Sequence, residues 1–464
     1  MEIAIIGMGI VALQTATKLT KSETVSKIHL VGPIHDIHSG TYAAGAMLNS
    51  MCEVDTLTFE SQYSKALFNL CLESNDLWIR QYESNNKDKY IETGTFLINA
   101  ASGDFYEDRN YSEVIRACRE YKQPFELTEP GDIPGLNPTN QNRTLNAIYL
   151  PREGFVNTPK LVNNLLSELR VNKFVNIVDS KISEIKFSGR QAKNLTTENG
   201  KRLHFDKLII AAGIHTVKLV QNFSSSFEDI QPIYCGVGNT ILLDTDNISS
   251  QSKCIRTPNR GGACGVYAMP RRDNGDKHQL LVGASNVVTA DPFYNPRLGS
   301  LQTILDNSQK TINRFLYKSH ISNITTGIRP VAKDGYPLMG ELKDSNVVIL
   351  SGTKRLGVHL SPIIAHYVFN LIEKLETNYF FKIFAPDRLP IYDINKNLCI
   401  ETIVEQLLSE QYQHGYTESG PLMHQQLVES YRSYVVKQFE NLSIEDHGLP
   451  IDTYKLFFKG ITKL

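Results

Sequence analysis

The sequence predicts an α/β fold built on a buried parallel sheet, and three observations carry this prediction. The first 31 residues contain a short apolar run, a glycine turn, a helical pattern and a second apolar run, which is the layout of a βαβ unit. Apolar runs typical of buried strands recur at residues 206–213 and 347–350. Hydrophobic residues make up 41% and charged residues 21% of the chain, as in globular proteins.

The opening unit is the most specific local signal. Residues 2–6 form an apolar strand pattern, and residues 10–19 place apolar side chains at helical spacing. Between these segments, Gly7, Gly9 and Ala12 fit G-x-G-x-x-G/A, in which the glycines let the backbone approach a pyrophosphate at the helix N-terminus. The pattern predicts a Rossmann-like domain, and alone it does not separate FAD from NAD.

The second strand of this βαβ unit lacks the acidic residue that usually ends it. This strand normally ends in Asp or Glu, which holds a ribose hydroxyl. Here it ends in Val31, Gly32 and Pro33. We therefore expect backbone groups, Asp36 or His35 to hold the ribose, unless it is held more loosely.

The sequence that follows predicts alternating helices and strands. Helices are expected at residues 57–82, 160–169 and 363–375, and strands at residues 91–99, 174–178 and 182–187. A stretch rich in Pro and Gly at residues 128–142 predicts a loop that crosses between domains. Strand-like runs dominate from residue 230 to 320 and predict an antiparallel second domain.

The carboxy-terminal part of the sequence has a different hydrophobic pattern. Residues 400–408 and 427–442 each carry one apolar stripe, which predicts amphipathic helices that cover another surface. Three roles remain open for them: a cap on the first domain, a homo-oligomer contact, or a receiver for a carrier-bound substrate.

Charge and cysteine content exclude several classes of protein. The 48 basic and 49 acidic side chains nearly cancel, which disfavours a nucleic-acid partner. The seven cysteines form no C-x-x-C pair, and the motif of His35 and His38 lacks further ligands, so we expect neither a disulfide framework nor a metal. No secretory signal or membrane span is apparent, and a cytoplasmic location is expected.

Four separated segments together point to one family. They are residues 41–48, 206–213, 327–340 and 351–362. In order and spacing, from residue 1 to about 375, they resemble the D-amino acid oxidase superfamily, especially the glycine oxidase and sarcosine oxidase branch. The resemblance implies FAD as the cofactor and an amino or imino acid as the substrate.

The resemblance also implies a division of the chain. The FAD-binding domain would comprise residues 1–90, 151–228 and 325–375, the substrate domain residues 91–150 and 229–324, and the helical extension residues 376–464. The fold expected is thus a Rossmann-like FAD-binding domain with an interleaved antiparallel-sheet domain.

A set of cofactor-binding residues follows from the resemblance and the glycine motif. They are Gly7, Gly9, Ile10, Val11, Ala12, Ala43, Ala44, Ala46, Met47, Leu48, Ile182, Ala212, Gly213, Arg329, Gly352, Lys354, Arg355, Leu356, Gly357 and Val358. The small side chains among them would let backbone amides approach a flat isoalloxazine ring.

Three residues are expected to act on the substrate. The guanidinium of Arg329 would bind its carboxylate as a bidentate fork, with the hydroxyl of Tyr267 in support. Arg355, beside Lys354, would lie at the pyrimidine edge of the flavin. The alternatives are a structural salt bridge for Arg329, a core position for Tyr267, and exposed loop charges for Lys354 and Arg355.

The reaction implied is oxidation of a C–N bond by hydride transfer to flavin N5, which gives an imine, with O2 as the expected acceptor and H2O2 as its product. A dehydrogenase of 2-hydroxy acids would instead need a base, for which His359 and His215 are candidates. A non-enzymatic, partner-binding chain is the third reading, based on the missing ribose acid, the atypical segment 234–238 and the loop 258–265.

Overall fold

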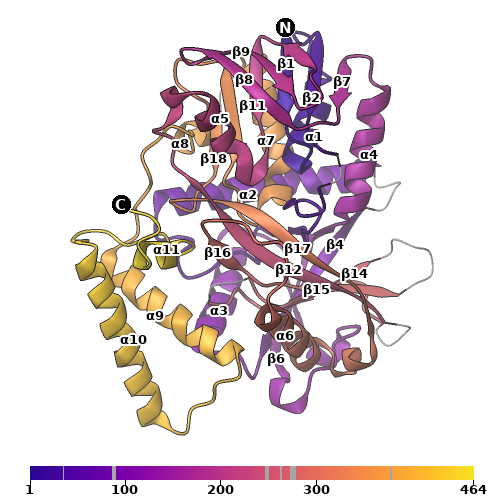
Figure 1. Ribbon diagram of the computed structural model, residues 1–464. Helices are drawn as coiled ribbons and strands as arrows, with labels where there is room; N and C mark the ends of the chain where they lie inside the picture. Colours follow the sequence, from indigo (N-terminus) through magenta and orange to yellow (C-terminus); the bar gives the residue numbers. More distant parts are fainter. Residues whose placement is uncertain (35, 86–89, 246–249, 262–263, 272–277, 377–378) are drawn as a thin grey trace.

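The computed structural model describes residues 1–34, 36–85, 90–245, 250–261, 264–271, 278–376 and 379–464. Two large sheets and a carboxy-terminal group of helices make up this part of the chain (Figure 1). None of its helices is both long and apolar enough to cross a membrane.

The first sheet has six strands. Their order is β18 (Leu338–Glu341), β19 (Val347–Ser351), β11 (Lys207–Ile210), β1 (Glu2–Ile6), β2 (Lys27–Val31) and β7 (Val175–Val178). Neighbours pair in parallel except β18, which runs antiparallel to β19. Alternate side chains of β1 enter two different cores, Ile3 and Ile5 on one face, Ala4 and Ile6 on the other. Burial on both faces explains why the strand is apolar throughout.

Helices cover one face of this sheet and a small sheet covers the other. The first face packs against α1 (Ile10–Leu19), α2 (Gln62–Asn85), α4 (Thr158–Val171) and α7 (Gly357–Ile372). The second packs against β8 (Ile182–Ser188), β9 (Gln191–Thr197), β10 (Arg202–His204) and α5 (Thr216–Phe223).

The second sheet is largely antiparallel. Its order is β16 (Val287–Thr289), β12 (Ile233–Asp244), β15 (Gln279–Gly283), β14 (Tyr267–Arg271), β13 (Cys254–Arg256), β4 (Ile91–Ala100), β6 (Thr144–Val156) and β3 (Met47–Leu48), with β17 (His320–Ala332) on β12 and β5 (Glu126–Thr128) on β6. Only β13 and β4 pair in parallel within the described sheet. Helices α3 (Phe105–Glu120) and α6 (Leu298–Asn307) accompany it.

The predicted fold class is confirmed, with local differences at its boundaries. Strands β6 and β17 run through the domain limits expected at residues 150 and 325, so the division into domains stays a prediction. Helix α2 begins at Gln62, where the Ser61 hydroxyl oxygen accepts a hydrogen bond from the Ser64 N–H at 3.0 Å. The residues before it form a separate turn, in which the Asp55 carboxylate accepts from the Leu57 N–H at 3.0 Å.

Helix α7 begins at Gly357, earlier than expected, although Pro362 lies inside it. A proline there removes one backbone N–H from the helix ladder. The hydroxyl of Ser361 donates to Val358 O instead, at 2.8 Å, and so satisfies that carbonyl.

The carboxy-terminal extension contains α8 (Tyr379–Ile383), α9 (Lys396–Gln413), α10 (Pro421–Asn441) and α11 (Tyr454–Phe458). Helix α8 packs into the core of the first sheet, whereas α9, α10 and α11 share a core of their own. Helix α10 is the outermost, and among its described residues only Val435 and Phe439 are buried (Figure 1). The segment before α11 returns to the sheets, where the Thr453 hydroxyl donates to Lys333 O at 2.8 Å. Of the two predicted amphipathic helices, α9 contacts α3 of the main body, and α10 packs on α9.

Candidate active site

One cavity joins segments that are far apart in the sequence. Its lining includes residues 7–11, 39–47, 211–213, 327–330 and 353–358. The first glycine turn thus meets the β17 and β19 ends around one shared space, as the proposed family arrangement requires. The carboxyl ends of β1, β11 and β19 open onto this space, which is where α/β sheets bind ligands.

The glycine turn is shaped for close approach of a ligand to the backbone. Gly7 has φ +129°, a conformation that favours glycine, and a Cβ on it would overlap the carbonyl of Ala211. Gly9 is the N-cap of α1 and offers no side-chain cap to the helix. The first N–H groups of α1 therefore lie at the wall of the cavity, where they suit an anion such as a pyrophosphate.

Thr41 was missed by sequence reasoning. Its Oγ1 accepts a hydrogen bond from the Ile10 N–H at 3.0 Å, and the side chain is buried. This contact ties residues 39–47 to the start of α1. A threonine within a predicted flavin-side segment gave no sign that it would cap a helix 31 residues away.

Tyr267 lies against the same segment. The side chain is 2% exposed, and a Cβ on Gly45 or Gly283 would overlap its ring and hydroxyl. Burial raises the pKa of the phenol well above its usual value. The hydroxyl therefore stays protonated over the ordinary pH range and is a hydrogen-bond donor at the cavity wall.

Arg329 lies half-buried on β17 and lines the cavity. Its Nη1 donates to Ser285 O and to Asn286 Oδ1, both at 3.2 Å. Its guanidinium crosses β12 over Gly238, where a Cβ would overlap it. Within the described residues no carboxylate lies within 4.0 Å of this guanidinium, so a structural salt bridge does not account for it.

Arg355 belongs to a buried charge cluster that the sequence did not reveal. Its Nε lies 3.0 Å from Glu53 Oε2, and Nη1 of the fully buried Arg256 lies 3.2 Å from Glu53 Oε1. Burial raises the pKa of Glu53, but the two guanidiniums outweigh it and hold that pKa below its usual value. One carboxylate therefore fixes both arginines, one of which reaches the cavity.

Glu153 holds the loop that carries Glu53. Its carboxylate accepts the backbone N–H groups of Ser50 (2.8 Å), Met51 (2.9 Å) and Cys52 (3.4 Å). Burial raises the pKa of Glu153 to about 7, although these three hydrogen bonds act in the opposite direction. The position of the charge cluster thus depends on a second buried acid.

Lys354 connects the cavity to the carboxy-terminal extension. Its backbone N–H donates to Pro330 O at 2.9 Å, and its ammonium group forms an ion pair with Asp452 of the extension. Both Lys354 and Arg355 have carboxylate partners, although the Arg355 side chain is still 35% exposed.

Most of the predicted site residues line the cavity. Those that do are Gly7, Gly9, Ile10, Val11, Ala43, Ala44, Ala46, Met47, Ala212, Gly213, Tyr267, Arg329, Lys354, Arg355, Leu356, Gly357 and Val358. Four do not: Ala12 and Leu48 are buried in the core, Ile182 packs against the β8 side of the sheet, and Gly352 fits tightly beneath β18.

The histidines and the ribose candidates are placed as follows. Asp36 and His215 line the cavity, and the charge of Asp36 acts on His215, whose pKa is lowered chiefly by burial. His35 lies outside the described residues. His359 is outside the lining: its Nε2 lies 2.9 Å from Cys71 O, and burial lowers its pKa to about 4. His359 is therefore not placed to act as a base on a ligand in this cavity.

The comparisons with known proteins agree with this geometry. The family described as FAD dependent oxidoreductase (DAO) matches residues 2–371. The chain belongs to this family. FAD is accordingly its cofactor, and the protein is an FAD-dependent oxidoreductase. No curated protein matches the chain in a sequence search.

Several solved structures share the fold of this oxidoreductase. Glycine oxidase from Geobacillus kaustophilus is 19% identical, with 83% of this chain and 98% of that chain covered and a TM-score of 0.67. Glycine oxidase from Bacillus cereus ATCC 14579 is 20% identical, with 84% and 99% covered and a TM-score of 0.68. L-proline dehydrogenase from P. horikoshii is 15% identical, with 83% and 97% covered and a TM-score of 0.66.

The cavity has the features that FAD requires. Gly7 has no room for a Cβ, which would overlap the Ala211 carbonyl, and the start of α1 at Ile10 and Val11 lines the same space as Gly7 and Gly9. Small side chains at Ala43, Ala44 and Ala46 leave the backbone of that segment accessible along the wall. The residues present therefore fit this cofactor.

Proposed function

We propose that this FAD-dependent oxidoreductase oxidises the C–N bond of an amino or imino acid, with O2 as acceptor and H2O2 as product. The observation that carries the proposal is the guanidinium of Arg329, which lines the FAD cavity without a carboxylate partner among the described side chains. A planar fork of donors in this position suits a substrate carboxylate. The glycine oxidases and the L-proline dehydrogenase that share the fold have names consistent with such a substrate.

We assign the cofactor to the residues around the cavity. Residues 7–11 would hold the pyrophosphate, residues 43–47 would lie along the isoalloxazine ring, and residues 353–358 would pass its pyrimidine edge. Bound FAD supplies a hydride acceptor at N5. Ala12, Leu48, Ile182 and Gly352 are proposed to support this site through packing, because they lie outside the lining.

The residues of the chain contribute position and charge to the reaction. Arg329 orients the substrate carboxylate, and the protonated hydroxyl of Tyr267 donates from the neighbouring wall. Arg355 keeps positive charge at the cavity because Glu53 holds its guanidinium in place. No protein base is required when the amine binds in its neutral form, and water hydrolyses the imine product after release of the hydride.

The experiment that tests the proposal is anaerobic mixing of the holoenzyme with a panel of amino and imino acids. Loss of the oxidised flavin absorbance reports reduction, and admission of air with H2O2 detection reports the acceptor. We expect Arg329→Ala to raise the KM for the substrate by about 30-fold or more, and Arg329→Lys to restore part of this loss, since removal of a charged hydrogen-bond partner costs about 2–5 kcal/mol.

The flavin spectrum of each variant provides the control, because FAD must remain bound for the comparison to hold. Reduction of the flavin by 2-hydroxy acids, but by no amino or imino acid, would overturn the proposal. Equal kinetics in wild type and Arg329→Ala would remove Arg329 from its proposed role.

A further inference from the structure

A second, larger cavity adjoins the FAD cavity. Its volume is about 470 Å³, against about 230 Å³ for the FAD cavity. The two share lining residues at their junction: Glu53, Ala284, Lys354, Arg355 and Leu356. A substrate held at the FAD cavity can therefore extend into this second cavity, which we call the outer chamber.

The outer wall of the chamber comes from the carboxy-terminal extension. Helix α9 contributes Gln406, Glu410 and Gln413, followed by His414, and residues 391–394, 448–452, 454–456 and Lys459 complete the wall. The family match ends at residue 371, so these lining residues lie beyond the part shared with the family. A chamber of this volume exceeds what the smallest amino acids fill and is of the size that binds drug-sized ligands.

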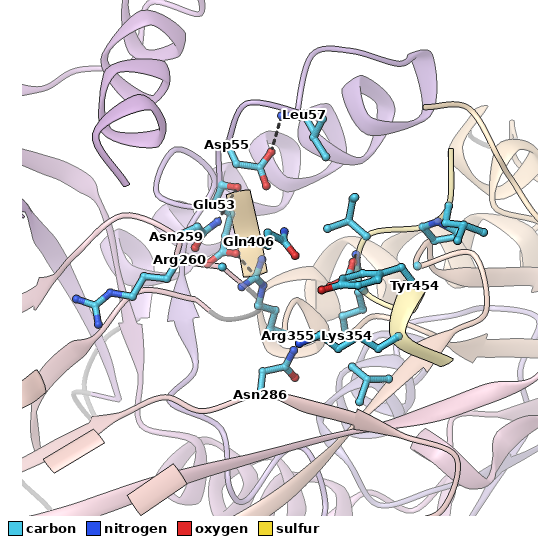
Figure 2. A pocket seen from close by; sticks show the side chains of 18 of the residues that line it. Glu53, Asp55, Leu57, Asn259, Arg260, Asn286, Lys354, Arg355, Gln406 and Tyr454 are labelled. Atoms are coloured by element: carbon cyan, nitrogen blue, oxygen red, sulfur yellow. Dashed lines mark hydrogen bonds and ion pairs between the residues drawn. The ribbon is translucent and has the colours of Figure 1, made fainter. Parts of the chain in front are cut away.

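Tyr454 presents an unpartnered hydroxyl to the chamber. Its side chain is 3% exposed, and its buried hydroxyl has no hydrogen-bond partner among the described residues. Figure 2 shows the hydroxyl directed toward the middle of the chamber, on the side facing Gln406 and Arg355. Buried hydroxyl groups are ordinarily paired, so this one is placed to pair with a ligand.

Most charges around the chamber cancel in pairs. Lys354 is paired with Asp452, Lys455 with Glu410, and the guanidinium of Arg260 turns away to Glu107 at 2.8 Å. Arg355 shares Glu53 with Arg256, and the exposed side chains of Arg297 and Lys459 line the chamber without a carboxylate within 4.0 Å among the described residues.

Two carboxylates in the lining have no such partner. Asp55 accepts hydrogen bonds only from its own turn, and Asp393 faces the hydroxyl of Tyr336 at 3.4 Å. Neither has a Lys, Arg or His nitrogen within 4.0 Å among the described residues. Burial raises the pKa of Asp55, with the charge of Arg355 acting against it. Arg355 acts on Asp55 from beyond 4.0 Å, and a cation in direct contact with Asp55 would supply the ion pair that this carboxylate lacks among the described residues.

We propose that the outer chamber binds the side arm of the substrate and that this arm ends in a protonated amine, paired with Asp55 and hydrogen-bonded to the Tyr454 hydroxyl. The inference rests on the proposed amino or imino acid oxidation. The carboxylate of the substrate is held at the FAD cavity by Arg329, and its cationic end lies in the chamber. The substrate class is therefore a basic amino acid or an imino acid with an aminoalkyl substituent.

The test is equilibrium binding of three probes of similar length to the holoenzyme under anaerobic conditions. Lysine ends in an ammonium group, norleucine in a methyl group and 2-aminoadipate in a carboxylate; each is used as both enantiomers. The change in flavin absorbance on titration gives the Kd. We expect lysine to bind at least ten-fold more tightly than norleucine and 2-aminoadipate to bind most weakly.

Two substitutions locate the preference. Asp55→Asn keeps an oxygen for the Leu57 N–H, and Tyr454→Phe removes only an unpartnered hydroxyl, so both variants should fold. Each should reduce the ratio of norleucine to lysine Kd at least five-fold. Asp306→Asn removes an exposed carboxylate outside the chamber and should leave the ratio as in wild type.

The outcomes separate the two proposals. Tight lysine binding without flavin reduction by any amino or imino acid would refute the oxidase reaction and support the cation site. Flavin reduction with norleucine bound as tightly as lysine, or a lysine preference that survives both chamber substitutions, would overturn the cation site alone. Failure of lysine to bind would also count against it.

Discussion

Replacement of Glu53 by Gln should destabilise the protein severely, because this carboxylate balances the buried guanidinium of Arg256 and also the partly exposed guanidinium of Arg355. Its oxygens lie 3.2 Å from Nη1 of Arg256, which is 0% exposed, and 3.0 Å from Nε of Arg355. A charge pair about 4 Å apart interacts by about 4 kcal/mol at the effective dielectric of protein sites. Breaking a buried pair costs about 3–5 kcal/mol, so we expect a loss of about 4 kcal/mol in the free energy of unfolding.

Urea unfolding followed by tryptophan fluorescence measures this loss. The chain has one tryptophan, and the indole N–H of Trp78 donates to His359 O within the main core, so its signal reports that core. Glu113→Gln is the matched control: its partner Arg116 is half-exposed on α3, and such pairs contribute at most about 1 kcal/mol.

The pH dependence of the Glu53 variant gives a second check. The pKa of Glu53 is lowered on folding, so its contribution is present above the unfolded pKa and is lost as the pH falls through the folded pKa. The difference between wild type and Glu53→Gln should therefore shrink below pH 4.5, the ordinary value for this acid. A Glu53→Gln protein within 1 kcal/mol of wild type at neutral pH would refute the charge-cluster reasoning.

Three further predictions concern residues that position the site. Thr41→Val should weaken FAD binding about five- to ten-fold, as a lost helix cap of about 1 kcal/mol implies, and Thr41→Ser should restore the affinity. Fluorescence titration of the apoprotein with FAD measures the affinity of each variant. Equal affinity for FAD in the two variants would contradict this role of Thr41. Burial raises the pKa of Glu153 to about 7, so the wild-type protein should lose stability on the order of 3 kcal/mol as the pH rises from 4.5 through 7, whereas Glu153→Gln should not. Urea unfolding of both proteins at pH 5 and pH 8 measures this difference. The same change of stability with pH in both proteins would refute the assignment. Asp452→Asn leaves Lys354 without its counter-ion and should raise the flavin midpoint potential and tighten sulfite binding; an unchanged potential would place Lys354 away from the ring.

Local signals in the sequence predicted the parts of the site that depend on backbone shape. Gly7 and Gly9 sit in a strand–turn–helix whose chemistry is contained within about 30 residues, and these glycines line the cavity as expected. The periodicity of β1 likewise follows from burial on both faces. Arg329 could be predicted from the sequence because the Gly-x-Arg-Pro segment that contains it is also local.

The charge cluster was beyond the reach of local patterns. Glu53 follows a cysteine in an irregular segment with no periodicity, and its partner Arg256 is 203 residues away. An arginine within the apolar strand β13 was the only sequence signal, because a buried guanidinium requires a buried acid. Sequence patterning cannot identify which acid that is.

The carboxy-terminal extension shows the same limit of prediction from sequence patterns. Its amphipathic stripes predicted that two helices bury apolar faces, and their common core confirms it. The polar side chains that line the chamber, such as Tyr454 and Gln406, are themselves buried and carry no sequence pattern of their own. Their role emerges only when the extension is seen to line the outer chamber beside the FAD cavity.

The most direct test of the central claim is product analysis after a single turnover. Holoenzyme is reduced anaerobically by the preferred amino or imino acid, and the organic product and released ammonia or amine are quantified against the flavin reduced. The account predicts one oxo acid and one ammonia or amine per flavin, with Arg329→Ala slow at the same substrate concentration. Reduced flavin without cleavage of a C–N bond would contradict it.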